Sequence, residues 1–305
     1  MSPGADHRPI VGINWGSSNF RAYLIARDGT LIDSHAEPSG VVGLDRAGMA
    51  ALVDAIGRRW PEAHARYASG MIGSNVGWVE VPYAEAPAGR AELARRAVAA
   101  TIGAVELVIV PGIACRHAID DAPDVLRGEE IEILGSAPAD GEAMIVLPGT
   151  HAKWTRVGDG RVVEFVTSMS GEIFDRLTTQ GLLASVTEGE GDVDDDFLAG
   201  VESGRARRMG LGSLLFGARA RVVRGGMRKD AAASYVRGLL IGSEIADARA
   251  AFPGFGDAPV TLAGNGPLSR LYAAALDSVG VASTQIGSQD ACLRGFLALH
   301  EALDG

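Results

Sequence analysis

Alternation of hydrophobic and polar residues along the first forty positions predicts three strands. The segment "PIVGIN" is apolar, and "FRAYLIA" alternates large apolar and polar residues. A third segment, "TLIDSHAE", follows an Asp-Gly turn at residues 28–29. Asp-Gly between two alternating runs is a strong hairpin signal. The period then becomes helical, because Met49, Leu52, Val53 and Ile56 fall on one face of a helix. The chain therefore opens with strands that are followed by a helix.

Strands and helices continue to alternate along the rest of the chain. In the first half we expect a strand near "YASGMIG", a helix around residues 89–100, the strand "VELVIVPG" and a helix opened by "LRGEEIEILG". Near the end we expect the strand "APVTLAGN", the segment "LSRLYAAALDSVG", the short strand "VASTQIG" and the helix "QDACLRGFLALHEALDG". Such alternation is typical of α/β folds.

The order of parts at the start of the chain is repeated in its middle. "EAMIVLPGTHAKWTRVGDGRVVEFVTSMSG" reads as strand, glycine loop, strand, Asp-Gly turn, strand and Ser-Gly, as does "VGINWGSSNFRAYLIARDGTLIDSHAEPSG". The interval from Gly29 to Gly40 is 11 residues, and so is that from Gly160 to Gly171. Residue identity between the copies is low, so the match is one of pattern. We interpret it as an internal structural duplication.

The duplication predicts two α/β domains around a central cleft. We expect an N-terminal domain over residues 1–139 and a C-terminal domain over residues 140–305. The C-terminal domain carries a largely helical insert at about residues 185–252, whose segments have long apolar faces at helical spacing. That insert has enough apolar surface for a homodimer interface, although a buried core face explains it equally well.

Composition and charge narrow the class of protein. The chain has 305 residues, 47% of them hydrophobic, and a formal net charge of −10, which argues against a nucleic-acid-binding surface. Its two cysteines, Cys115 and Cys292, lack the spacing of a disulfide framework or a zinc site. His64 and His300 show no spacing that suggests a metal site either. With no apolar leader or membrane-length segment, we expect a cytoplasmic protein.

Three glycine-rich loops follow apolar strands and are candidates for holding phosphate. Small residues let backbone N–H groups approach an anionic oxygen, and hydroxyls add further donors. Taken alone, the first loop is better explained as a plain hairpin turn, for which its composition is also suited. The loop residues are Gly16, Ser17, Ser18 and Asn19 in the first, Gly149, Thr150, His151 and Lys153 in the second, and Gly264, Asn265 and Gly266 in the third.

The duplication favours the phosphate-binding interpretation. Two such loops that face each other across a cleft can hold the β- and γ-phosphates of a nucleotide, with His151 and Lys153 as positive donors. A lone lysine after a turn is more commonly a solvated surface group. The chain contains no Walker A loop, and the third loop does not match the dinucleotide fingerprint.

Two further segments carry candidate substrate chemistry. "LRGEEIEILG" places Glu129 or Glu130 as a general base at a helix start, with Arg127 able to hold a substrate carboxylate. Acids in a first helical turn are also expected simply because they suit the helix dipole. In "GMIGSNVGW", Ser74 and Asn75 can bind sugar hydroxyls while residue 78, a tryptophan, walls the pocket. A surface turn with a buried tryptophan is the alternative for that loop.

The motifs "INWGSSNFRAYL", "GMIGSNVGW", "VPGI", "LRGEEIEILG", "LPGTHAKW", "MSGE" and "GLLIGSE", in this order, resemble the 2-dehydro-3-deoxygalactonokinase family. The resemblance extends from about residue 9 to residue 303. It implies an actin-like (hexokinase-like, ribonuclease H-like) ATPase fold of two duplicated α/β domains. It also implies ATP- and Mg²⁺-dependent phosphorylation of the terminal 6-hydroxyl of 2-dehydro-3-deoxy-D-galactonate in galactonate catabolism.

The family's functional positions carry over onto this sequence. The two phosphate loops and the adenosine region correspond to the three loops above, and the base corresponds best to Glu129, with Glu130 a close second. Relatives carry Asp where this chain has Asn14, a position that helps to hold the hydrated Mg²⁺. The substitution removes a negative charge there, so it weakens catalysis unless another acid such as Glu129 shares the metal role. The predicted substrate-binding residues are Arg21, Ser74, Asn75, Trp78 and Arg127.

Two alternatives to this function stay open at the level of sequence. A kinase for another small sugar or sugar acid would show the same motifs, because loop residues set the choice of substrate. A nucleotide-dependent binding protein of the same fold would also do so, with Asn14 marking lost catalysis.

Overall fold

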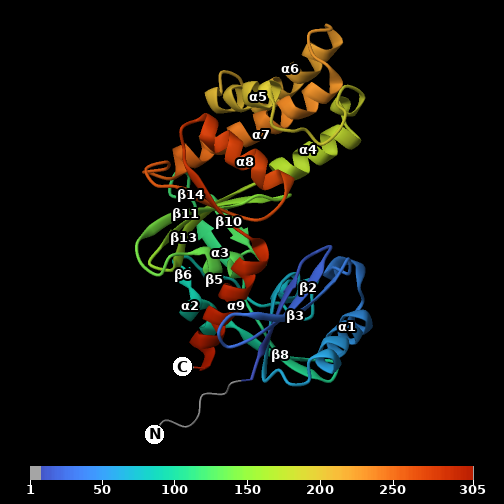
Figure 1. The fold of residues 1–305 in the computed structure, drawn as a ribbon, viewed down its shortest axis with the longest axis vertical. Coiled ribbons are helices and arrows are strands. Elements are labelled where there is room, and N and C mark those ends of the chain that lie inside the picture. The colour runs from blue at the N-terminus through green and yellow to red at the C-terminus, as the bar shows by residue number, and fades with distance from the viewer. Residues whose placement is uncertain (1–7, 305) are drawn as a thin grey trace.

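Two mixed sheets form the framework of the computed structural model, which describes residues 8–304 (Figure 1). Each sheet begins with three antiparallel strands and continues with parallel strands reached through helices, and the first sheet ends in an antiparallel edge strand. Short loops can only reverse the chain, whereas a parallel neighbour needs a longer crossover. The strands of the first sheet are Ile10–Trp15 (β1), Phe20–Ile25 (β2), Leu31–Glu37 (β3), Ala65–Gly70 (β4), Val98–Ile102 (β7) and Val105–Ile109 (β8).

The second sheet repeats this arrangement. Its strands are Ala88–Gly89 (β6), Glu142–Leu147 (β11), Ala152–Gly158 (β12), Arg161–Ser168 (β13), Val260–Ala263 (β14) and Ser283–Ile286 (β15). The orders are β3-β2-β1-β4-β8-β7 and β13-β12-β11-β14-β15, with β6 added beside β13. In both sheets the first strand pairs in parallel with the next strand after the antiparallel three, which follows α1 in the first sheet and the helices of the insert in the second. The duplication predicted from the pattern is therefore confirmed, and the fold is the predicted α/β class.

Two glycines at equivalent places support the same conclusion. A Cβ on Gly40 would overlap the main chain at Ser17, and a Cβ on Gly171 would overlap the main chain at Gly149. Each glycine lies at the end of one of the two equal intervals found in the sequence. Because it has no Cβ, it lets the chain that follows the third strand pack directly onto the glycine loop in each repeat. A backbone hydrogen bond closes each contact. The N–H of residue 41 donates to the carbonyl of residue 16 at 3.1 Å, and the N–H of residue 172 donates to the carbonyl of residue 150 at 3.0 Å.

The helices of the first half follow the sequence pattern with one exception. They are Arg46–Arg59 (α1), Arg90–Arg96 (α2) and Glu130–Ser136 (α3), with single 3-10 turns at Val41–Gly43 and Met71–Gly73. All four apolar residues predicted for one face of α1 are buried against the first sheet. The helix expected over 89–100 ends at Arg96, because the next residues pair with β8 as the edge strand β7. Pairing across the sheet outweighs the weak helical preference of this segment.

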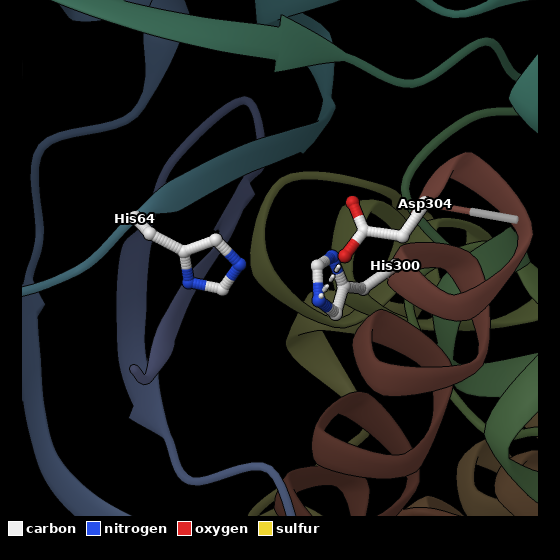
Figure 2. Close-up of side chains that lie close together, drawn as sticks. All are labelled: His64, His300 and Asp304. Atoms are coloured by element: carbon white, nitrogen blue, oxygen red, sulfur yellow. Dashed lines mark ion pairs between the residues drawn. The ribbon is translucent and has the colours of Figure 1, made fainter. Parts of the chain in front are cut away.

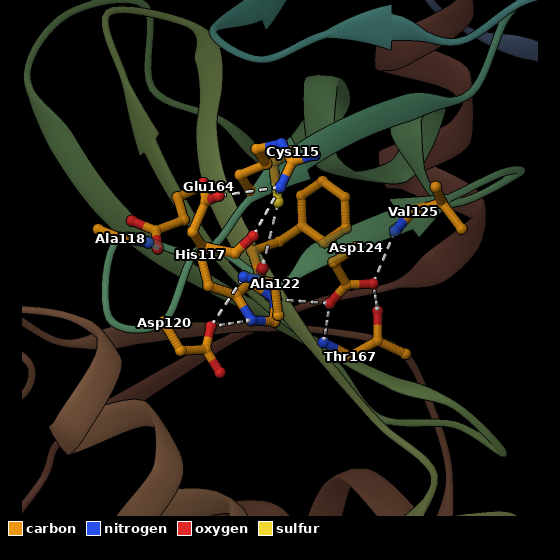
Figure 3. A network of polar contacts seen from close by, with 12 residues as sticks. Cys115, His117, Ala118, Asp120, Ala122, Asp124, Val125, Glu164 and Thr167 are labelled. Carbon is orange, nitrogen blue, oxygen red and sulfur yellow. Dashed lines mark hydrogen bonds and ion pairs between the residues drawn. The ribbon is translucent and has the colours of Figure 1, made fainter.

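A small sheet that the sequence pattern did not reveal connects the two halves. Its strands are Ala84–Glu85 (β5), Ile113–Arg116 (β9) and Pro123–Leu126 (β10), in the order β10-β9-β5. Figure 3 shows the polar network that fixes this sheet to β13. Asp124 accepts hydrogen bonds from N and Oγ1 of Thr167 at 2.7 and 2.8 Å, and Glu164 accepts one from Ala118 N at 2.7 Å. Strands this short carry too little periodicity to be predicted.

The predicted insert is largely helical. The helices of this half are Ser170–Thr179 (α4), a 3-10 turn at Leu182–Ser185, Asp195–Ala206 (α5), Leu211–Val223 (α6), Lys229–Ala251 (α7) and Pro267–Ser278 (α8). Helices α5 and α7 approach each other through reciprocal glycines. A Cβ on Gly200 or Gly204 would meet the backbone of α7, and one on Gly238 or Gly242 would meet that of α5. In Figure 1 this bundle lies at the opposite end of the molecule from α1.

The closing helix Ser288–Asp304 (α9) returns to the first half. It packs against α3 through Gly135 and Gly295, where a Cβ would overlap the facing backbone. Gly12 of β1 similarly makes room for the ring of Phe296. One hydrophobic core therefore contains residues of both halves, among them Ile10 and Phe165. Among residues 8–304, no helix has the length and apolar character required to cross a bilayer.

Candidate active site

A cavity of about 690 Å³ lies where loops of both halves meet. Its lining comes from β2 and β3, the start of α3, the loop at residues 148–151, the turn after β14 and the first turn of α9. The two repeats therefore contribute to one concave site, which has the size usual for small-molecule sites.

The second glycine loop forms one wall of this cavity. Gly149, Thr150 and His151 line it, and the Nε2 of His151 lies 2.7 Å from a carboxylate oxygen of Glu172 in the first turn of α4. A Cβ placed on Gly149 would meet nothing within 4 Å, so its backbone is open to a ligand. Lys153 follows on β12, and its Nζ donates to the carbonyl oxygen of His151 at 3.0 Å.

Buried contacts hold the strand that carries Lys153. The neighbouring Trp154 donates from Nε1 to Glu244 on α7 at 2.7 Å, and Tyr272 on α8 donates to the same carboxyl group at 2.8 Å. Burial raises the pKa of Glu244 to about 7 in spite of these bonds. The network joins β12 to α7 and α8 and so fixes the Lys153 strand.

The third loop lies beside the second. Gly264 and Asn265 line the cavity, and Gly266 precedes the first turn of α8. Gly264 and Gly266 have φ angles of +151° and +88°, values that glycine adopts without strain. The Gly264 carbonyl accepts a bond from Gln285 Nε2 at 2.9 Å.

The first glycine loop has a different position. Gly16 N donates to Asn19 O at 2.9 Å, which closes a tight turn, and residues 17–19 are exposed. None of Gly16, Ser17, Ser18 and Asn19 is among the residues that line the cavity, whereas Arg21 on β2 is. A phosphate-binding role of this loop stays a prediction.

Glu129 and Glu130 have opposite environments despite being adjacent. Glu129 lines the cavity and forms an ion pair with Lys153, whose Nζ lies 2.9 Å from Glu129 Oε1. The side chain of Lys153 is 4% exposed, so this pair is shielded from water on the lysine side. Glu130 is fully buried and accepts hydrogen bonds from Ser69 Oγ and Gly128 N, each at 2.6 Å. Burial raises its pKa to about 7.

Glu132 is a cavity residue that the sequence reasoning missed. It lies three residues after Glu129 and therefore on the same face of α3. Its pKa is raised to about 7, chiefly by burial and in part by the charge of Glu129, while Ser288 and Arg21 act to lower it. That spacing from Glu129 was the signal in the sequence that could have identified it.

Asn14 is connected to Glu132 through Cys292. Its Nδ2 is 3.5 Å from Gly128 O and 3.8 Å from Cys292 Sγ, and the Cys292 thiol in turn contacts Glu132. Burial raises the pKa of Cys292 well above its usual range, so the thiol stays protonated. Cys292 thus links the neutral side chain at position 14 to Glu132, a carboxyl group that is charged only once it loses its proton, at a pKa of about 7.

Arg127 has donors without acceptors. Its Nη2 donates to Val81 O at 2.8 Å, and its guanidinium lies 4.2 Å from the centre of the Tyr83 ring. Its Nε and Nη1 are buried and have no hydrogen-bond partner among the described residues. Because unpaired buried donors are costly, such a group is expected to bind an anion.

The loop of residues 70–78 lies beside Arg127 but outside the cavity lining. A Cβ on Gly73 would come within 3.0 Å of the Arg127 Nη1. Ser74 Oγ donates to Met71 O at 2.7 Å, and Asn75 is exposed. Trp78 is half-buried, with the Arg46 guanidinium 3.9 Å from its ring centre. Their substrate contacts stay predictions.

Comparison with known proteins adds independent information. A family model described as 2-keto-3-deoxy-galactonokinase matches residues 14–299. A protein named a probable 2-dehydro-3-deoxygalactonokinase from Rhizobium meliloti (strain 1021) is 34% identical over 306 residues, covering 96% of this chain and 97% of that protein. The 2-dehydro-3-deoxygalactonokinase of Escherichia coli (strain K12) is 30% identical over 294 residues, covering 96% and 98%.

Solved structures agree with these sequences. A crystal structure of a candidate 2-dehydro-3-deoxygalactonokinase from Sinorhizobium meliloti superposes with a TM-score of 0.86 at 32% identity, covering 96% of this chain and 97% of that one. Component A of the (R)-2-hydroxyglutaryl-CoA dehydratase of Acidaminococcus fermentans superposes with a TM-score of 0.52 at 12% identity, covering 97% and 99%. The second likeness concerns the fold alone, which is the actin-like ATPase fold.

Proposed function

The chain belongs to the 2-keto-3-deoxy-galactonokinase family, and from this membership we propose how its cavity transfers a phosphoryl group. The protein is a sugar-acid kinase, a phosphotransferase with an alcohol group as acceptor. The proposed reaction moves the γ-phosphoryl group of ATP to the terminal 6-hydroxyl of 2-dehydro-3-deoxy-D-galactonate, in galactonate catabolism. A cytoplasmic enzyme with a small-molecule substrate fits this role.

The cavity suits a nucleoside triphosphate. The open backbone at Gly149 and the hydroxyl of Thr150 would hold the phosphates, and the turn at Gly264 and Asn265 would lie along the adenosine. Backbone N–H groups in glycine-rich loops hold phosphate well, because no side chain blocks the approach. The first loop, at residues 16–19, would close on the phosphates from the opposite repeat when the two halves move together.

The observation that carries the proposal is the Lys153–Glu129 ion pair at the cavity wall, with its 2.9 Å separation. Glu129 would take the proton of the substrate hydroxyl as the hydroxyl oxygen bonds to the γ-phosphorus and the bond to ADP breaks. Lys153 would stabilise the charge on the transferred group in a partly dry site. Glu130 would serve instead as a positioning residue, since its carboxyl group is occupied by Ser69 and Gly128.

The acids around Asn14 fit a hydrated Mg²⁺. Carboxylate and amide oxygens are the donors that Mg²⁺ prefers, and Glu129 and Glu132 both line the cavity. Glu132 would supply the charge that Asn14 lacks, while the Asn14 amide keeps one acceptor oxygen. When bound, Mg²⁺ neutralises charge on the nucleotide phosphates.

Arg127 is the proposed anchor of the substrate carboxylate. Its Nε and Nη1 are unpaired but buried outside the cavity lining, so the substrate carboxylate would reach one of them when the two halves move; its backbone N–H bonds to the side chain of Glu129 at 3.0 Å. The acid end would therefore lie close to the group that receives the hydroxyl proton. Arg21, Ser74, Asn75 and Trp78 would complete the recognition of the sugar acid.

Glu129→Gln compared with Glu130→Gln tests the assignment of the base. Removing a general base lowers kcat by about 10²- to 10⁴-fold. We expect a loss of this size for Glu129→Gln with little change in the KM for ATP, and a loss below about tenfold for Glu130→Gln. Full turnover by Glu129→Gln would show that another group accepts the proton.

A homodimer through the helical insert is also proposed. Phe216 and Val223 on α6 are 59% and 64% exposed, which leaves apolar surface available on this helix. Light scattering of the purified chain, with Phe216→Ser as the variant, tests it. A monomer that is unchanged by the substitution would refute it.

A further inference from the structure

Three side chains that the sequence did not connect come together at the end of the molecule away from the helical bundle. His64 precedes β4, whereas His300 and Asp304 lie in the last turns of α9. Figure 2 shows the two imidazoles and the carboxylate facing a common point. One potential ligand atom from each residue lies within 4.8 Å of the other two. The site shares no described residue with the cavity above.

The ring nitrogens that face this point are His64 Nε2 and His300 Nε2. Both are buried and form no hydrogen bond of good geometry among the described residues, and the group paired with His300 Nε2 is the Asp304 carboxylate, 3.1 Å away. The other nitrogen of each ring is occupied: His64 Nδ1 lies 3.1 Å from Pro9 O, and His300 Nδ1 lies 2.6 Å from the Tyr67 hydroxyl. A carbonyl only accepts, so Nδ1 of His64 carries the proton and its Nε2 carries the lone pair. Metal-binding histidines typically have such a partner on the second nitrogen.

We propose that His64, His300 and Asp304 bind one divalent transition-metal ion of the Zn²⁺ class. Two imidazoles and one carboxylate are the ligands of zinc sites, whereas Mg²⁺ and Ca²⁺ prefer oxygen alone. Ligand atoms of a tetrahedral zinc site lie about 3.3 Å apart. His300 Nε2 and Asp304 Oδ2 are already 3.1 Å apart, and His64 is in the short segment before β4, so a small movement of its ring closes the site. Water would take the fourth position.

Arg27 is the charged neighbour that opposes a bound cation. Its Nη2 lies 3.7 Å from Asp304 Oδ2, and the two side chains are 30% and 49% exposed. Glu301, the residue after His300 on α9, is exposed and offsets this charge in part. The guanidinium competes with the metal for Asp304, so Arg27→Gln is expected to bind Zn²⁺ several-fold more tightly.

A metal at this point would join the start of β4 to the end of α9. Helix α9 reaches the cavity through Ser288 and Gln289 in its first turn, and it packs between the two halves of the chain. The ion would therefore fix the far end of a helix that contributes to the active site. Its expected role is structural, and a ligand that binds only the folded state raises the unfolding temperature.

The test is Zn²⁺ titration of the full-length, untagged chain after treatment with a chelator. Calorimetry is expected to show one tight site per chain. His64→Gln and His300→Gln should each weaken it by at least about 100-fold. His117→Gln is the matched control, because His117 is also half-buried between carboxylates, Asp120 and Asp124, but lacks a second imidazole. It should bind Zn²⁺ as the unmodified chain does.

Bound Co²⁺ gives a second measurement of the same site. The intense visible absorption of four-coordinate Co²⁺ should appear in the unmodified chain and disappear in His64→Gln, whose fold is checked by circular dichroism. The proposal is wrong if folded protein binds no Zn²⁺. It is also wrong if both histidine variants keep the tight site, or if Mg²⁺ binds there as tightly as Zn²⁺.

Discussion

Replacing Glu130 with Gln should remove a pH-dependent loss of stability. Glu130 is fully buried, and its pKa rises from 4.5 to about 7 in the folded protein, chiefly because burial penalises the charged form. Between these values the folded state holds a proton that the unfolded chain has lost. Stability therefore falls as pH rises through this window and is restored at lower pH. A pKa increase of this size corresponds to about 3 kcal/mol.

Gln is the matched substitution because it has the same shape and cannot ionise. Its carbonyl can still accept the hydrogen bond from Gly128 N, and the Ser69 hydroxyl can rotate to accept from the new amide. Any cost of this rearrangement is the same at every pH. The free energy of unfolding of Glu130→Gln minus that of the unmodified chain therefore changes with pH only through the titration of Glu130. This change is about 2.5 kcal/mol between about pH 5 and about pH 8.

Urea unfolding at these two pH values, followed by both tryptophan fluorescence and circular dichroism, measures the effect. As the pH is raised, the free energy of unfolding of Glu130→Gln should increase by this amount relative to that of the unmodified chain. Asp33→Asn is the control, because the hydrogen bond from the Trp60 indole lowers the pKa of Asp33 below the whole range. A difference between the unmodified chain and Glu130→Gln that stays constant with pH would refute the reasoning.

Four further substitutions test the proposed site. Lys153→Met should lower kcat by about 10²- to 10³-fold in a coupled ADP assay, because a preorganised charge is lost; wild-type turnover would exclude the role. Arg127→Lys should raise the KM for the sugar acid by about 10- to 100-fold with a smaller change in kcat, since the guanidinium donor to the carboxylate is lost; an unchanged KM counts against it. Gly171→Ala should raise the KM for ATP and lower the melting temperature, because the methyl group displaces the second glycine loop, whereas Gly212→Ala, in open space on α6, should do neither. Asn14→Asp should increase Mg²⁺-dependent kcat, because Glu132, with a pKa raised to about 7, supplies only part of the missing charge near neutral pH; an unchanged value would show that Glu132 or another acid already supplies it in full.

Turn residues and the spacing of apolar residues predicted those parts of the fold whose conformation is decided by a few neighbouring residues. The Asp-Gly turns, the apolar face of α1 and the equal intervals that end at Gly40 and Gly171 gave the hairpins, the first helix and the duplication. These features could be predicted because turn conformation and helical burial are encoded within a few neighbouring residues. The edge strand β7 and the sheet of β5, β9 and β10 could not, because their pairing partners decide their conformation.

The candidate site was predictable in its residue types but not in their roles. Sequence alone could not separate Glu129 from Glu130, since the difference is the full burial of one carboxyl group between Ser69 and Gly128. The unpaired donors of Arg127 depend on the packing around its guanidinium, which sequence does not show. The meeting of His64 and His300 likewise depends on the return of α9 to the first half, a contact between segments far apart in the chain.

The central claim is tested most directly by the product of the reaction. The chain is incubated with ATP, Mg²⁺ and 2-dehydro-3-deoxy-D-galactonate, and the phosphorylated carbon is identified from phosphorus–proton couplings by NMR while ADP is counted. The account predicts one ADP for each 6-phosphate formed, with the highest kcat/KM for this acceptor among related 2-keto-3-deoxy sugar acids. Release of ADP without a phosphorylated acid, or a clear preference for a different acceptor, would contradict it.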